Sequence, residues 1–172
     1  MKAVEYSENL KKLISNLSNQ TRISEIAVKE LEGLMKARIF NDGLDSNNNK
    51  IGNYSTKESY FGPSQFFKKK PLKSIKFDNG YKGFREYLGR QTAYVDLMLS
   101  GSLMLSLTTY KIGSQYVLAI RDNPNDSVSE ALKAEGNEDR FNTTIFEPSE
   151  SEKKAVKKAI ETQIDIIFKK FL

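Results

Sequence analysis

The chain has 172 residues and a formal net charge of +5, and it contains neither cysteine nor histidine. This length suits one domain with a buried core and is short for two. Without cysteine the chain has no disulfides, no cysteine-ligated zinc and no thiol nucleophile, and without histidine it lacks the commonest metal ligand and general base. We therefore expect no enzymatic activity, no cofactor, and no catalytic or metal-binding residues.

The hydropathy pattern gives no sign of a targeting or membrane segment. The N-terminal residues MKAVEYSENLKKLISNL carry charges throughout, unlike a signal peptide. No segment approaches the roughly 18 to 20 consecutive apolar residues that a membrane helix needs. The sequence predicts a soluble protein made in a cytoplasm, with no membrane partner.

Apolar residues at spacings of three and four predict a long N-terminal helix from about Glu5 to Arg38. The polar run Ser18 to Thr21 interrupts this stripe, so two helices meeting near Asn19 are the alternative. Asn41-Asp42-Gly43 then predicts a helix end, because glycine adopts the left-handed conformation readily.

Residues 40–101, which we call the arm, are rich in turn residues, aromatics and lysines and poor in periodic apolar residues. A connection of this length in a compact domain is usually functional or disordered, and its aromatics favour order on contact. Nine basic and three acidic residues between Lys57 and Arg90 give this part a net charge of +6. We predict that the arm reaches a neighbouring subunit.

Two groups of residues in the arm are candidates for contact with partners. Aromatic side chains dominate interface hot spots, which makes the following the expected subunit-interface anchors: Tyr54, Tyr60, Phe61, Phe66 and Phe67. The expected contacts with DNA or an acidic partner are Lys68, Lys69, Lys70, Lys73 and Lys76. A lysine-rich loop in solvent is the simpler alternative for the second group.

The local patterns within the arm predict short elements. Asp45 to Asn49 begins like a calcium-binding loop, but Lys50 replaces the required glycine and Thr56 the closing glutamate. A polar turn is favoured instead, with Ile51, Tyr54 and Tyr60 on the sides of a hairpin. A short helix is expected over residues 79–90, followed by an extended segment over residues 92–101.

After the arm, the sequence predicts a hairpin and a short helix. Leu103, Leu105 and Leu107 alternate with other residues as in a strand, and Gln115–Ile120 is expected to return beside it. Ser127 and Glu130 form a capping-box pattern for a helix ended by Gly136. The following Phe141, Ile145 and Phe146 are expected in the core.

A second capping box, Ser149 with Glu152, predicts the start of a C-terminal amphipathic helix. Its apolar stripe is Val156, Ile160, Ile164, Ile167 and Phe171. The predicted fold class is α+β: a single domain over residues 1–172, in which the long N-terminal helix and the C-terminal helix pack on a small antiparallel β-sheet, with the arm extended from it.

The order of these parts resembles that in a protein family of tailed bacteriophages. These are the virion-morphogenesis or tail-completion proteins, which lie in the neck between portal and tail. Those proteins have an N-terminal helix, a long loop, a D-L-x-L-[ST]-G-x-L-x-x-S-L run, a β-hairpin, a short helix and a final amphipathic helix. Residues 96–107, DLMLSGSLMLSL, are similar to that run, and the motif residues are Asp96, Leu97, Leu99, Ser100 and Gly101. The similarity covers roughly residues 20–172, and the loop RIFNDGLDSNNNKIGNYS resembles that of ring proteins below the portal in crAss-like phages.

The resemblance implies a structural virion protein that forms a homo-oligomeric ring in the neck, or head-tail connector. Portal or adjacent connector and tail proteins would be its partners, packaged DNA would pass through its channel, and it would assemble in the host bacterial cytoplasm. The alternative is a free nucleic-acid-binding protein that uses the aromatics for stacking and the lysines for phosphates. A magnesium-dependent enzyme using Asp42, Asp45 and Asp96 is a third hypothesis, which has no base, nucleophile or motif behind it.

Overall fold

The computed structural model describes residues 20–63, 71–122 and 128–169. Its first element is helix α2 (Gln20–Lys36), which passes directly into a π-helical turn, η1 (Ala37–Asn41). This agrees with the C-terminal half of the predicted first helix, while the residues before Gln20, including the predicted break near Asn19, lie outside the described residues. The turn buries Arg38, Ile39 and Phe40, and so brings the end of the helix into the core.

A β-hairpin packs against α2. Strands β3 (Leu107–Ile112) and β4 (Gln115–Ile120) are antiparallel, with Leu107 opposite Ile120 and Ile112 opposite Gln115. The prediction of a strand beginning at Leu103 was wrong, because residues Ser102–Ser106 form a short helix, α4. Leu103 and Leu107 are both buried across this change of structure, whereas Leu105 is exposed. Their spacing of four residues is helical, and this brings both into the core.

Helix α5 (Glu130–Phe141) is longer than predicted and begins later. Its N-cap is Ser129, whose hydroxyl accepts a hydrogen bond from the amide of Leu132, rather than Ser127, which lies outside the described residues. Gly136 does not end the helix, which continues to a left-handed C-cap at Asn142. Ile145 is fully buried in the core, and Phe141 and Phe146 pack partly buried against it, as predicted.

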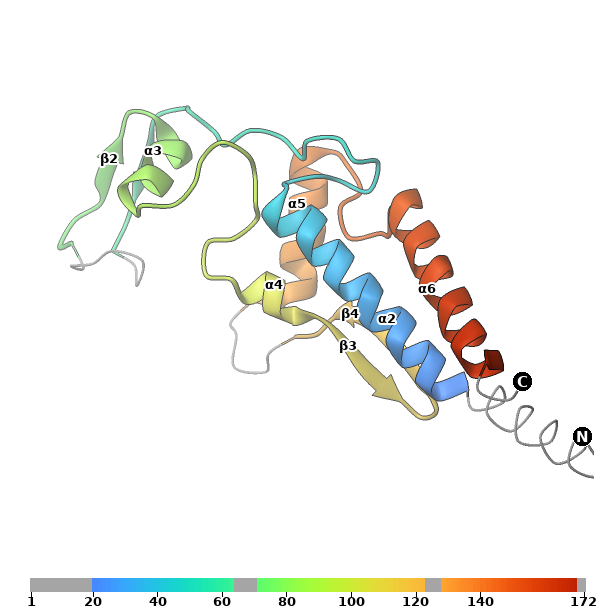
Figure 1. Cartoon of the computed structure of the whole chain (residues 1–172). Helices are drawn as coiled ribbons and strands as arrows, with labels where there is room; N and C mark the ends of the chain where they lie inside the picture. The colour runs from blue at the N-terminus through green and yellow to red at the C-terminus, as the bar shows by residue number, and fades with distance from the viewer. Residues whose placement is uncertain (1–19, 64–70, 123–127, 170–172) are drawn as a thin grey trace, which may run out of the picture.

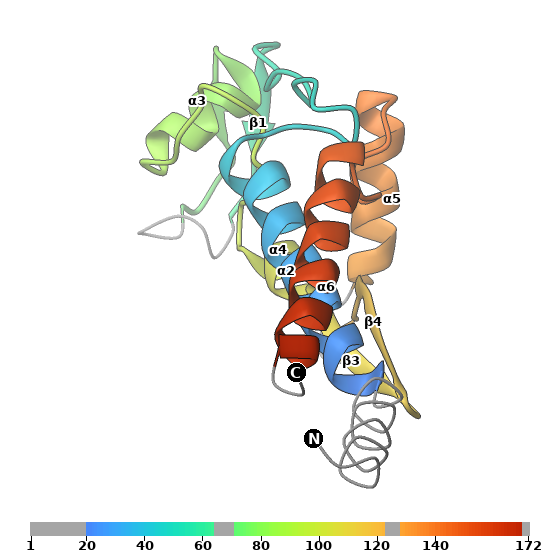
Figure 2. The same cartoon turned by 45° about the vertical axis from the view of Figure 1, so that its right-hand side comes forward.

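The C-terminal helix α6 (Glu150–Lys169) begins at the predicted capping box. The Ser149 amide donates to Glu152 Oε2 at 2.6 Å, and the Glu152 amide donates to Ser149 Oγ at 3.2 Å. Glu152 also accepts from Arg38 Nε at 2.8 Å, and both side chains are buried. This ion pair joins the start of α6 to η1, at the end of α2. Helix α2 packs on both the hairpin and α6 (Figures 1 and 2). The combination of helices with antiparallel strands confirms the predicted α+β class.

The arm does not form one extended segment. Its two ends belong to the core, where Phe40, Ile51, Tyr54 and Val95 are buried. An antiparallel bridge between Leu44 and Lys50 closes the predicted polar turn, but Ile51 and Tyr54 lie outside any strand, so that part of the predicted hairpin was wrong. The middle part folds into a separate projection, which we call the lobe (residues 57–63 and 71–90 of those described). Figure 1 shows that the lobe projects away from the helices of the body and is joined to it by two segments without regular secondary structure, which we call the connecting segments.

Candidate functional site

The lobe is built around a small aromatic cluster. Strand β1 (Ser59–Phe61) pairs antiparallel with β2 (Ile75–Phe77), and helix α3 (Gly80–Tyr87) packs against both. Helix α3 confirms the short helix predicted over residues 79–90. Phe61 stacks on Phe84 with ring centroids 4.3 Å apart, and Phe77 meets both rings edge to face. Such offset and edge contacts add stability beyond the apolar area that they bury. The projection is therefore a folded unit with an apolar centre of its own.

Gly80 fixes the start of α3 against the first connecting segment. Its φ of +54° is in the left-handed region, and a Cβ atom there would lie 2.2 Å from the carbonyl oxygen of Lys57. The Lys82 amide donates a hydrogen bond of 3.0 Å to the Ser55 carbonyl beside this contact. Only glycine combines that backbone conformation with so close an approach. The sequence Asn79-Gly80 therefore sets how the helix lies against the chain that leads into the lobe.

A buried carboxylate, Asp96, joins the lobe to the body. Tyr54 donates its hydroxyl to Asp96 Oδ1 at 2.8 Å, while Arg85 Nη2 and Gln91 Nε2 donate to Oδ2 at 2.9 and 2.6 Å. The Met98 amide also donates to Oδ1. We call these residues the Asp96 node. Because α3 supplies Arg85 and the two connecting segments supply the rest, the node ties both segments and the lobe together.

The other contacts of Arg85 strengthen this connection. Its guanidinium donates to the carbonyls of Gln91 and Met98 and lies 4.4 Å from the centre of the Tyr54 ring. Arg85 and Asp96 are 1% and 3% exposed, so the ion pair at the centre of the node is removed from water, whereas Gln91 is half-buried. Burial raises the pKa of Tyr54 well above its ordinary value, and its hydrogen bond to the Asp96 carboxylate acts in the same direction. Tyr54 therefore remains a neutral donor.

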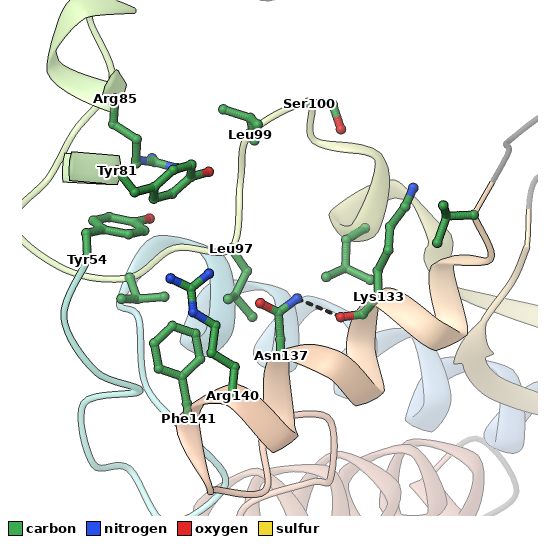
Figure 3. A pocket seen from close by; sticks show the side chains of 13 residues that line it. Tyr54, Tyr81, Arg85, Leu97, Leu99, Ser100, Lys133, Asn137, Arg140 and Phe141 are labelled. Carbon is green, nitrogen blue, oxygen red and sulfur yellow. Dashed lines mark hydrogen bonds between the residues drawn. The ribbon is translucent and has the colours of Figure 1, made fainter. Parts of the chain in front are cut away.

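A cavity of about 490 Å³ lies between the node and α5. Figure 3 shows Tyr54, Tyr81 and Arg85 on one side, Leu97 and Leu99 on the connecting segment, and Lys133, Asn137 and Arg140 rising from α5. Phe141 closes the lower end, and its ring lies 5.4 Å from the Arg140 guanidinium. The cavity thus combines apolar walls with cationic side chains from α5.

Of the three carboxylates in the magnesium hypothesis, Asp45 and Asp96 have internal hydrogen-bond partners, whereas Asp42 is exposed. Burial acts to raise the pKa of Asp45, but hydrogen bonds from Thr143 and from the amides of Asn49 and Asn47 outweigh it and lower the pKa. Asp45 thus holds the turn that the sequence favoured over a calcium loop. Across the part of the chain that the structure describes, no three acidic side chains gather in a way that could hold a metal ion.

The predicted interface aromatics are placed very differently from one another. Tyr54 is buried in the interior and is not available as a surface anchor, and Phe61 is half-buried in the aromatic cluster of the lobe. Tyr60 projects into solvent with 65% of its surface exposed. Phe66 and Phe67 lie outside the described residues. The structure adds two exposed apolar side chains that the sequence analysis did not select, Leu72 and Tyr87.

The predicted basic residues are likewise divided. Lys73 is exposed on the lobe, and Lys76 pairs with Glu58 and Asp78, each at 2.9 Å. The hydrogen bonds to Asp78 and Glu58 raise the pKa of Lys76, although burial acts in the opposite direction. The positive charge of Lys76 is therefore locally balanced. The remaining three, Lys68, Lys69 and Lys70, lie outside the described residues.

The motif of residues 96–101 is where the second connecting segment re-enters the body. Asp96 is the centre of the node, and Leu97 has a φ of +51°, which is uncommon for a residue other than glycine. Leu97 and Leu99 line the cavity, and Ser100 and Gly101 lead into α4, where Gly101 is the left-handed N-cap. The motif therefore has a structural role in this chain, and the conformation of Leu97 had no signal in the sequence.

Comparison with known proteins found no matching family model, no matching curated protein and no matching solved structure. Among the described residues no helix is both long enough and apolar enough to span a membrane.

Proposed function

We propose that this chain is a structural virion protein whose copies form an oligomeric ring in the neck of a tailed bacteriophage, between portal and tail and around the DNA channel. The observation that carries the proposal is the lobe, a folded projection that presents exposed apolar side chains away from the body. The position in the neck is supported by the resemblance in the order of parts and in residues 96–107.

A closed ring needs two different surfaces on each subunit, because each copy offers one and receives another. The lobe provides Tyr60, Leu72 and Tyr87, which are 65%, 100% and 54% exposed. The face formed by α4 and the start of α5 provides Leu105, Val128 and Leu132, which are also exposed. Apolar residues gathered on a surface often mark contact sites, so the chain has candidates for both halves of such an interface.

The attachment of the lobe also suits assembly. A binding element that is held in place before contact loses less conformational entropy when it binds. The Asp96 node fixes the lobe to the body through buried groups, and the hydrogen bond from the Lys82 amide to the Ser55 carbonyl adds a contact with the first connecting segment. The proposal therefore assigns the node a positioning role and no chemistry.

The test is the assembly state of the purified full-length chain, measured by negative-stain microscopy and mass photometry over a range of concentrations. We expect closed rings of one subunit number, formed alone or on addition of portal protein. Changing Tyr60 and Tyr87 together to serine should reduce assembly, whereas Ile166→Ser, at an exposed apolar position on α6, should not. A wild-type chain that stays monomeric at all concentrations and with every neck partner would contradict the proposal.

The nucleic-acid-binding alternative is less well supported. Phe61 is packed within the lobe and Tyr54 within the body, so neither ring is presented for stacking on a base. The charge of Lys76 is already balanced by two carboxylates. Binding of DNA that is tight in low salt and weakens steeply as salt rises would favour this alternative over the ring.

A further inference from the structure

Glu130, the first residue of α5, is a buried carboxylate with incomplete hydrogen bonding. Its side chain is 1% exposed, and Oε1 accepts a hydrogen bond from Lys133. Within the described part of the chain, Oε2 is the buried side-chain oxygen for which no donor is found. A buried polar atom without a partner is destabilising, and such atoms are uncommon in folded proteins. This oxygen needs a donor from elsewhere.

Glu130 lines a hollow of about 270 Å³ on the outer side of α4. The other lining residues are Ser102, Leu105, Ser106, Thr108, Arg121 and Asp122. The Asp122 carboxylate is anionic, because hydrogen bonds from the Ser129 hydroxyl and the Ala131 amide lower its pKa. Leu105, 71% exposed, supplies an apolar rim. The hollow therefore has the carboxylates of Glu130, which pairs with Lys133 through Oε1 alone, and of Asp122, together with the guanidinium of Arg121 and an apolar edge.

This chemistry selects a lysine side chain as the occupant. Its ammonium group has three donors for a carboxylate, and its methylene chain can cover an apolar rim. The lobe carries an excess of positive charge, with six basic and three acidic residues in 57–63 and 71–90. Residues 130–141 of α5 have the opposite balance, with four acidic and two basic residues. The two surfaces are complementary in charge.

On these grounds we propose that the Glu130 hollow binds Lys73 from the lobe of a second copy of this chain, with the neighbouring Leu72 packed on Leu105. Lys73 is exposed and Leu72 is fully exposed. The lobe stands apart from α4 and β4 in both views of the molecule, so the contact is between copies (Figures 1 and 2). This inference rests on the proposed ring and specifies one of its contacts.

Cysteine cross-linking tests the contact directly, because the natural chain contains no cysteine. Leu72→Cys and Leu105→Cys are made as separate proteins, mixed and oxidised under mild conditions. We expect a disulfide between the two different variants, and none when Ile112→Cys, at another exposed apolar position, replaces Leu105→Cys. Cross-links that form only between identical variants, or equally well with Ile112→Cys, would overturn the proposal.

Charge-neutral variants test the pairing of Glu130 with Lys73. Lys73→Gln alters an exposed residue and should weaken assembly roughly 30-fold or more, the effect of truncating one partner of a buried charge pair. Glu130→Gln should weaken it similarly while its thermal unfolding shows that the fold is kept. Lys57→Gln, which removes the same charge elsewhere on the lobe, should have little effect. Equal weakening by Lys57→Gln and Lys73→Gln would overturn the specific pairing.

The two proposals fail in different ways. Rings that form normally from Lys73→Gln and Glu130→Gln proteins would overturn this contact and leave the ring proposal standing. A wild-type protein that forms no ring under any condition would overturn both.

Discussion

At the scale of single residues, Asp96 has the largest structural role outside the apolar core. It accepts four hydrogen bonds, and one of its donors is the buried guanidinium of Arg85. Removing one member of a buried ion pair leaves the other charge without compensation, and this destabilises proteins by about 3–5 kcal/mol. The buried ion pair with Arg85 therefore gives Asp96, the first residue of the motif, a role in stabilising the fold.

The first prediction is that Asp96→Asn lowers the free energy of unfolding by about 3–5 kcal/mol, because Arg85 stays buried without its counter-charge. Denaturation by urea, followed by circular dichroism, measures this change. Asp165→Asn, at an exposed position on α6, is the control and should change stability by less than about 0.5 kcal/mol. Equal stability of the two variants would show that the node does not bear on folding.

The second prediction concerns Tyr54 and alkaline pH. Since its pKa in the folded protein is raised above the ordinary value of 10.0, the folded state is favoured fully below pH 10, and this contribution is lost as pH rises further. In Tyr54→Phe this pH-dependent contribution is absent, so the difference in stability between wild type and variant should shrink above pH 10. At neutral pH the variant should be less stable by about 1–3 kcal/mol, because Asp96 loses a donor.

Two measurements check this. Unfolding curves at several pH values give the stability difference. Phenolate absorbance should show that the wild type has a tyrosine that ionises at unusually high pH and that is missing from Tyr54→Phe. A constant stability difference across the alkaline range would contradict the assignment.

At the scale of elements, the reliable sequence signals were local. The start of α6 follows from Ser149 and Glu152, which satisfy each other's amides within one turn. The return strand β4 and the helix α3 were also placed correctly, whereas the first strand of the hairpin was predicted over residues that form α4. Leu103 and Leu107, four residues apart, fit both periods in so short a run, whereas Leu105 fits a strand only and is exposed in the structure.

The errors in the arm have a different physical cause. Tyr54 was predicted to be an interface anchor because it is an aromatic residue in a polar stretch, and the sequence around it does not indicate which residue it contacts. That partner is Asp96, which is 42 residues away in the sequence. Arg85 lies in the helix predicted over residues 79–90, but its burial depends on the same distant carboxylate. Sequence patterns resolve contacts within a turn or hairpin, and these contacts lie beyond that range.

The third prediction compares two glycines in helices. Gly80→Ala should destabilise the protein by more than about 2 kcal/mol, because the new Cβ meets the Lys57 carbonyl and the left-handed backbone is strained. Gly136→Ala, within α5 and with no neighbour near its Cβ position, should instead stabilise by about 0.5–1 kcal/mol. Thermal unfolding of the two variants checks the opposite signs; a stabilised Gly80→Ala would mean that α3 does not abut residue 57.

At the scale of the whole molecule, the chain has a body and a lobe whose apolar centres meet at Tyr81, which contacts Tyr54 of the core and Phe61 and Phe84 of the lobe. The body is held by the core around Met35, Ile39 and Ile145 and by the Arg38–Glu152 ion pair. The lobe is held by the Phe61, Phe77 and Phe84 cluster and is joined to the body through the Asp96 node. A small unit joined in this way can open without unfolding of the rest.

The last prediction follows from this division and is tested by hydrogen exchange. In the wild-type monomer, lobe amides such as that of Lys82, which donates to Ser55, should exchange faster than those of the β3–β4 hairpin, because the lobe buries less apolar surface. Asp96→Asn should speed exchange in the lobe far more than in the hairpin. Assembly should slow exchange in the lobe and around the Glu130 hollow, since the proposed interface covers both and not the α2–α6 contact. Uniform changes across lobe and body in both experiments would mean that the chain opens as one unit, and the lobe would then have no separate role in assembly.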